Sequence, residues 1–287
     1  VDYDKEVIGK GPYLPLRSLA LDNAYPVLQG YKNHAGIGYQ ANIADPLAYA
    51  YLGIAAADTP AADLPGDQKA HVEVTGNYLG WRAGLWWNRS DFYDLFGPTK
   101  RSLKGYAAKL GYTKWLVWDE PKTLSLTYDL AYYDGIDTLP GAQNASTAFS
   151  QLFTAEAAIH STDVQQSIGA VDGEKGMSWD GVLTANVVNG QTIAQVRGHF
   201  GCGSPLPIPH SPIWLRSAAG AASGDRTNVV ANFYFGRFGN NYVDARPVQR
   251  YREYDSLPGF GIDAVSGLSF VREMVEWNAP PVFFESI

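Results

Sequence analysis

Hydrophobic and polar residues alternate with a period of two along most of the chain. In the segment 124–132, Leu and Tyr occupy every second position, and Ser, Thr, Asp and Ala occupy the positions between them. Because successive side chains of a β-strand point to opposite faces, this pattern predicts a strand with one apolar and one polar face. The pattern recurs in 153–160, 178–187 and 194–200, whereas helical periodicity is weak throughout. The chain is therefore predicted to be all-β.

About twelve strands are expected, most of them separated by turn residues. The expected strands are 33–43, 47–57, 70–79, 81–90, 104–117, 122–134, 148–161, 177–188, 191–201, 211–221, 227–236 and 267–277. Asn189-Gly190, which lies between two alternating runs, is the strongest hairpin signal. Longer polar connections are expected at 135–147 and 162–176. Residues 1–24 are expected to form an irregular lead-in segment before a β-barrel over 25–287.

Two antiparallel architectures fit this alternation. A soluble sandwich would carry a charged outward face and an apolar inward face. Here the polar face carries mainly uncharged side chains, and aromatic residues gather at strand ends, as in Trp86-Trp87, Trp115, Trp118 and Tyr132-Tyr133. Aromatic girdles at strand ends are typical of transmembrane barrels. The pattern favours an antiparallel transmembrane β-barrel, with an aromatic-rich soluble β-protein as the alternative.

Composition argues against three features: a nucleic-acid partner, a membrane-spanning helix and a disulfide framework. The formal net charge is −7, which argues against a basic nucleic-acid-binding protein, so no nucleic acid is expected as a partner. The longest nearly apolar run, Leu47 to Ala57, is too short for a membrane-spanning helix, which needs roughly 20 residues. A single cysteine, Cys202, excludes an intrachain disulfide framework.

No motif indicates catalysis. The five histidines, His34, His71, His160, His199 and His210, are not at close metal-ligand spacing, and the chain has no nucleophile elbow, phosphate-binding loop or dinucleotide fingerprint. The chain is therefore expected not to be an enzyme and to bind no cofactor or metal. Because carboxylates and tryptophans are present, a soluble carbohydrate-binding or carbohydrate-hydrolysing β-protein stays open as an alternative.

Several segments resemble a known family. They are 13–19 with Tyr25-Pro26, 91–100 with 104–106, 233–241, 250–254, 257–260 and 276–281. Together they resemble bacterial surface-antigen outer-membrane barrels, in the branch that is fused to a TolB-like β-propeller. The superfamily includes the BamA and TamA assembly barrels and the two-partner secretion transporters.

The resemblance implies a function at the bacterial outer membrane. The implied fold is part of a sixteen-strand barrel that is incomplete at its C-terminal end. The implied partners are outer-membrane lipid and lipopolysaccharide, with other envelope proteins or a propeller domain. The implied role is to assist protein insertion, translocation or envelope-complex assembly, and a passive pore or structural barrel in a larger envelope complex is the alternative.

A loop near 244–260 carries the candidate site. In the family an Arg-Gly-aromatic motif reaches into the barrel lumen, and its nearest match here is Arg252-Glu253-Tyr254, with Glu in the place of Gly. Arg250 and Arg252 are the expected lumen-facing cations of this loop. An arginine in a lumen favours bidentate pairing with a carboxylate. We expect Arg252 to contact a lumen-facing acid, with Asp180 and Glu276 as the candidates.

Overall fold

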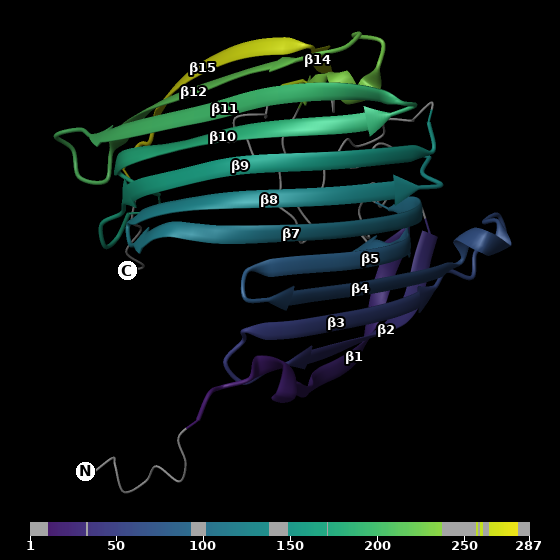
Figure 1. Ribbon diagram of the computed structural model, residues 1–287. Helices are drawn as coiled ribbons and strands as arrows, with labels where there is room; N and C mark the ends of the chain where they lie inside the picture. Colours follow the sequence, from purple (N-terminus) through teal and green to yellow (C-terminus); the bar gives the residue numbers. More distant parts are fainter. Residues whose placement is uncertain are drawn as a thin grey trace, which may run out of the picture.

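A computed structural model describes the chain over residues 11–32, 34–92, 102–137, 149–170, 172–236, 257, 259–260 and 264–280. These residues form one long antiparallel sheet (Figure 1). Twelve of its strands run the width of the described sheet: β1 (Ala20–Tyr31), β2 (His34–Ala44), β3 (Ala50–Asp58), β4 (Ala70–Tyr78), β5 (Trp81–Arg89), β7 (Leu103–Asp119), β8 (Lys122–Asp134), β9 (Gln151–Gln165), β10 (Lys175–Val188), β11 (Gln191–Pro205), β12 (Pro212–Ala222) and β15 (Ser269–Trp277). The prediction of an antiparallel all-β fold is confirmed.

Six short elements complete the described fold. The two-residue strand β6 (Asp91–Phe92) joins the far side of β1, and β13 (Phe233–Phe235) pairs with β14 (Val265–Gly267) outside the main sheet. Short 3-10 helices are η2 (Pro15–Arg17), η3 (Gly66–Gln68) and η4 (Val229–Ala231). Each of the twelve long strands pairs with its nearest long neighbour in the chain, so the sheet is a simple meander.

Two regions differ from the predicted strand pattern. Strand β1 is not among the expected strands, the first of which was 33–43, and it begins at Ala20, inside the segment that was expected to be irregular. Pro26 lies in the middle of this strand, and proline is tolerated there because β1 is an edge strand, where a missing N–H needs no partner. The expected strand 227–236 is wrong: η4 and the short β13 replace it, and β15 pairs with β12 instead.

The predicted hairpin at Asn189-Gly190 is confirmed. It joins β10 to β11, and both turn residues have positive φ, as a two-residue type I′ turn requires. From this turn the register runs without a shift for thirteen residue pairs, from Val188 opposite Gln191 to Gly176 opposite Gly203. The turn therefore sets which side chains of β10 and β11 lie opposite each other.

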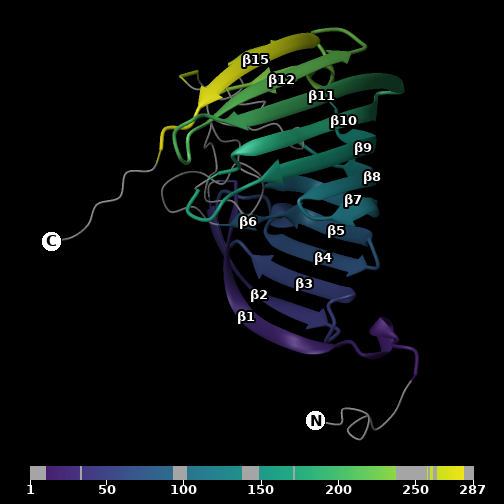
Figure 2. The same ribbon diagram turned by 90° about the vertical axis from the view of Figure 1, so that its left-hand side faces the viewer.

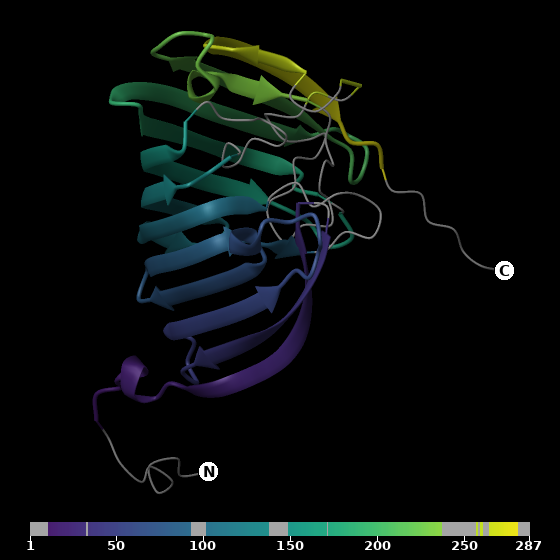
Figure 3. The ribbon, with the colours of Figure 1, turned by 90° about the vertical axis from the view of Figure 1, so that its right-hand side faces the viewer.

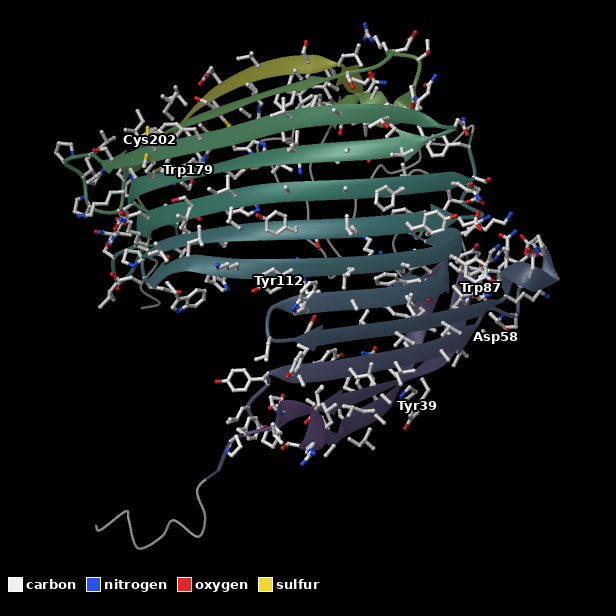
Figure 4. All side chains as sticks on the ribbon, viewed as in Figure 1. Tyr39, Asp58, Trp87, Tyr112, Trp179 and Cys202 are labelled. Carbon is white, nitrogen blue, oxygen red and sulfur yellow. The ribbon has the colours of Figure 1, made fainter. Side chains whose placement is uncertain are left out.

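The sheet is strongly curved, with β1 and β15 at its two edges (Figures 2 and 3). Its convex face is turned toward the viewer in Figure 4, which labels Tyr39, Trp87, Tyr112 and Trp179 on it. Large exposed apolar side chains cover this face along the strands: Ile37, Tyr39, Ile54, Val72, Trp81, Leu85, Tyr106, Leu110, Tyr128, Leu130, Tyr132, Phe153, Leu183, Val196, Phe200, Leu215, Val271, Val275 and Trp277. The alternate positions, which include Asp129, Glu156, Asp180 and Arg197, face the concave side.

The two ends of the strands differ in their connections. At the short-turn rim lie the start of β1, the end of β15 and the connections 45–49, 79–80, 120–121, 166–174 and 206–211. At the opposite, long-loop rim lie the tight turns 32–33 and 189–190 and the longer connections 59–69, 93–102, 135–150 and 223–264. Both ends of the meander therefore lie at the short-turn rim.

An apolar core fills the concave face near the long-loop rim. Val188 and Ile193 of the β10–β11 hairpin pack with Val230 and Ala231 of η4, which have 6% and 0% of their surface exposed. The Gln195 side chain donates hydrogen bonds to the carbonyls of Val230 and Ala231 at 3.1 and 3.2 Å. This segment of the β12–β15 connection is therefore folded back over the sheet.

A buried polar cluster ties β1 to the strands β4 and β5. The His71 ring, on β4, packs against the fully buried Tyr31 ring and lies within hydrogen-bond distance of the Thr59 hydroxyl and the Asn88 carbonyl. The Asn88 side chain donates to the Asp67 and Ala70 carbonyls and accepts from the Gly105 N–H. These contacts hold the end of β5 where β6 can pair with Gln29 and Gly30 of β1.

Closure of the whole sheet is not seen in the described residues. There β15 pairs with β12 alone, and β1 pairs with β2 and, over two residues, with β6. No described pair joins β1 to β15, so the described residues form an open, curved sheet and not the closed barrel that was predicted.

The buried cluster makes a testable prediction at Asn88. Asn88→Ala removes three hydrogen bonds and leaves the Gly105 N–H without its acceptor, so the free energy of unfolding should fall by about 2–3 kcal/mol. Urea unfolding followed by tryptophan fluorescence measures this loss. Asn77→Ala, at an exposed asparagine of β4, is the matched control and should cost less than about 0.5 kcal/mol. Equal losses in the two variants would contradict the assigned role.

Candidate functional site

The polar concave face is the candidate functional site. Neighbouring strands place charged side chains opposite one another there, because the meander keeps every second residue on the same side. Asp129 and Glu156 are direct cross-strand neighbours. Arg82 lies 3.1 Å from Asp129, and Thr184 donates to Glu156 at 3.0 Å. The Arg82–Asp129 pair reaches across β7, which lies between β5 and β8, so charge on this face is partly balanced between strands.

Asp180, one of the two predicted acids, lies on the concave face of β10. Both of its carboxylate oxygens are 2.9 Å from Nδ1 of His199 on β11. His160 of β9 stands opposite Asp180 on the other side. The sequence analysis did not identify His199 as the partner of Asp180. The Asn189-Gly190 turn could have done so, because residues at equal distances before and after a two-residue turn pair with each other, and this places 180 opposite 199.

Glu276, the other predicted acid, lies on the concave face of the edge strand β15. Its carboxylate is 3.2 Å from Nε of Arg216 on β12, and the Arg216 guanidinium also lies over the Trp214 ring at 5.0 Å. The side chains of Arg216 and Glu276 are 21% and 12% exposed, so this pair is more enclosed than Arg82 and Asp129 at 43% and 44%. Sequence alone could not pair these residues, because more than forty residues separate β12 from β15.

The predicted loop residues Arg250, Arg252, Glu253 and Tyr254 lie outside the residues that the structure describes. Their contacts with Asp180 or Glu276 stay a prediction. What the described strands add is that each acid already has a basic partner on its neighbouring strand. An arginine from this loop would therefore join an existing pair.

A second polar cluster ties two connections together at the short-turn rim. Glu174 accepts hydrogen bonds from the Ser167 hydroxyl and lies 3.0 Å from Nδ1 of His210. The hydrogen bond from Ser167 outweighs the opposing effect of partial burial, and with His210 it holds the pKa of Glu174 below its ordinary value. Ser167 and His210 both contact the Glu174 carboxylate. The Nδ1 atom of His210 lies near both this carboxylate and the Ser167 hydroxyl. A catalytic triad needs the histidine between the acid and the hydroxyl, which is not the arrangement here. The contacts instead connect the 166–174 and 206–211 connections.

Metal ligation has no support in the described part of the chain. No group of three or more His, Cys, Asp or Glu side chains is placed there to hold an ion. Cys202, the single cysteine, lies on the convex face (Figure 4). No helix among the described residues is both long and apolar enough to cross a membrane.

The two sheet edges are the other notable feature. Strand β15 carries Glu273 on its convex side, between Val271 and Val275, where it accepts a hydrogen bond from Ser217 at 2.5 Å. Of the other charges on the convex face, Asp58, Lys122, Asp134 and Lys175 stand at the first or last position of their strands, whereas Lys114 of β7 and Asp163 of β9 stand within theirs. Among the described residues, Glu273 thus places a charge on the convex face of an edge strand.

Comparison of the chain with protein-family models, with curated proteins and with solved structures gives no match.

The enclosed pair on β12 and β15 generates a prediction. Arg216→Ala leaves the half-buried Glu276 carboxylate without this cation, so the free energy of unfolding should fall by about 2–4 kcal/mol. Arg82→Ala removes a cation from the more exposed pair and should cost about 1 kcal/mol or less. Chemical unfolding of both variants measures the difference. A larger loss for Arg82→Ala would contradict the assigned order.

Proposed function

We propose that the sheet forms the wall of a transmembrane β-barrel in the outer membrane of a Gram-negative bacterium. The observation that carries the proposal is the contrast between the two faces: large exposed apolar side chains on the convex face and polar, partly paired side chains on the concave face. Soluble monomers rarely expose apolar patches larger than a few hundred Å². In a bilayer the same surface would contact lipid, and the concave face would contact water.

The height of the apolar surface fits this proposal. On β8 the convex apolar positions run from Leu124 to Tyr132. At about 3.3 Å per residue they extend over roughly 26 Å along the strand. With a strand tilt of about 40° this corresponds to roughly 20 Å, close to the apolar band of about 25 Å in outer-membrane barrels.

The distribution of turns supports an orientation. Outer-membrane barrels have short turns on the periplasmic side and longer loops on the outer side. By this rule the short-turn rim, which holds both ends of the meander, would face the periplasm. The rim with connections 59–69, 135–150 and 223–264 would face outward, toward lipopolysaccharide.

The role that we favour is assistance in protein insertion, translocation or envelope-complex assembly, as in the proteins that the sequence resembles. In lipid every backbone N–H and C=O must be paired, so the edges of β1 and β15 that lack a partner among the described residues need a strand beside them. Pro26 removes one backbone donor from β1, and Glu273 places a charge on β15. Both features weaken strand addition. A weakly sealed seam of this kind could open and pair with a strand of a client protein.

A passive pore or a structural barrel in a larger envelope complex is the second candidate, and the polar concave face favours it. Against an open pore stands the apolar core of η4 with Val188 and Ile193, which covers part of the concave face near the long-loop rim. Neither role involves covalent chemistry. The soluble carbohydrate-binding alternative would need this apolar convex surface to remain in water.

Lipid contact tests the membrane proposal. Nitroxide labels or brominated-lipid quenching should report lipid at Leu130 and Val196, which are 46% and 53% exposed on the convex face, and at Leu126. Asp129 and Arg197, their neighbours on the concave face, should report none. The reverse pattern would contradict the assignment of the faces, and a protein that stays monomeric without detergent would contradict the membrane location.

An insertion assay separates the two candidate roles. Liposomes that contain the protein should accelerate the folding of an added, urea-unfolded outer-membrane barrel relative to empty liposomes. Planar-bilayer recordings of the same preparation should show low conductance. High steady conductance without acceleration would favour the passive pore.

A further inference from the structure

An apolar patch lies outside the strands, at the short-turn rim beside β1. Tyr13, Leu14 and Leu16 of the segment that leads into β1 are exposed, as are Leu47, Tyr49 and Leu79 of the neighbouring turns. The Tyr13 and Tyr49 rings lie 6.3 Å apart, and the Leu79 N–H donates to the Tyr49 carbonyl at 3.2 Å. We call these six residues the rim patch. Three segments that are separate in the sequence thus present their apolar side chains together.

Hydrogen bonds to Asp45 hold two segments of the rim patch together. This buried carboxylate accepts hydrogen bonds from the Tyr13 hydroxyl at 2.5 Å and from the backbone N–H groups of Leu47 and Ala50. Burial alone would raise the pKa of Asp45, but these hydrogen bonds outweigh it and hold the pKa below its ordinary value. The lead-in segment is therefore fastened to the β2–β3 turn by a side chain that remains charged at neutral pH.

The exposure of large apolar side chains in the rim patch is unusual for a protein surface in water. Leu16 and Leu47 are 60% and 57% exposed, although the segment around them is firmly bonded. Along the chain the patch continues into Leu21, which pairs with Ile43 on the convex face of the sheet and is itself exposed. The apolar surface of the wall therefore extends past the strand ends at this rim.

We infer that the rim patch is an interfacial anchor, which lies in the headgroup region of the membrane leaflet at the short-turn rim. This inference rests on the proposed membrane location and goes beyond it, because it assigns a lipid-binding role to a segment outside the barrel wall. Tyrosine suits this depth, since its ring is apolar and its hydroxyl is polar. Leu14 and Leu16 would enter the boundary between headgroups and acyl chains. Arg17, the last residue of η2, would reach the lipid phosphates.

Lipid is the occupant that the surroundings favour. The patch adjoins the surface that would contact acyl chains, so lipid covers both without a change of partner. A protein partner would be expected to meet polar groups that are free to bond, whereas the Tyr13 hydroxyl and Asp45 are already bonded to each other.

Site-directed spin labelling tests the anchor in the full chain. In a Cys202→Ser background, single cysteines replace Leu16 or Leu47 in the patch, Leu130 on the convex face and Ala62 in the exposed β3–β4 connection. Each labelled protein is placed in phosphatidylethanolamine–phosphatidylglycerol vesicles. The ratio of collisions with oxygen, which partitions into lipid, to collisions with a water-soluble nickel complex reports the depth of each label.

The anchor predicts ratios at Leu16 and Leu47 that lie between the high value at Leu130 and the low value at Ala62. Ratios at Leu16 and Leu47 equal to that at Ala62, with Leu130 still in lipid, would overturn the anchor and leave the membrane proposal intact. Shielding of Leu16 from both reagents would overturn it in favour of a protein partner. A water-accessible label at Leu130 would instead contradict the membrane proposal itself.

Discussion

Backbone pairing between strands that follow one another in the chain is the interaction on which the rest of the structure depends. Each hairpin turn fixes one register, and the register decides which side chains of two strands face each other. Because the side-chain period is two, a shift by one residue would move every apolar side chain of a strand to the concave face. The separation of an apolar and a polar face over the whole sheet is therefore a consequence of correct pairing at each turn.

Curvature brings together groups that the meander alone would keep apart. The polar cluster of Tyr31, His71 and Asn88 joins the first strand to the fourth and fifth, and β6 then closes this end of the sheet over two residues. At the long-loop rim, η4 covers apolar side chains of β10 and β11. Both contacts bury groups on the concave side, where a flat sheet would leave them in water. They explain how one wide, curved sheet keeps its shape near the long-loop rim.

The two edge strands contain the residues that support the proposed role in protein insertion or translocation. Most residues of the sheet satisfy their backbone groups with two neighbours, whereas in the described part of the chain β1 and β15 have one neighbour each along most of their length. Pro26 and Glu273 both occur in these edge strands. Natural proteins use proline and misplaced charge to limit edge pairing. In the proposed barrel the same residues would make the seam its weakest joint.

The sequence by itself determined the all-β class, most strand positions and the face on which each side chain lies, because alternation and turn residues act over a few neighbouring positions. The partnership of Asp180 with His199 was also within its reach, through the Asn189-Gly190 turn. Only the tertiary structure decided that β1 begins at Ala20, that η4 replaces an expected strand and that Arg216 meets Glu276. In each of these cases the stabilising partner is distant in the sequence or depends on an edge position, and local pattern contains no information about either.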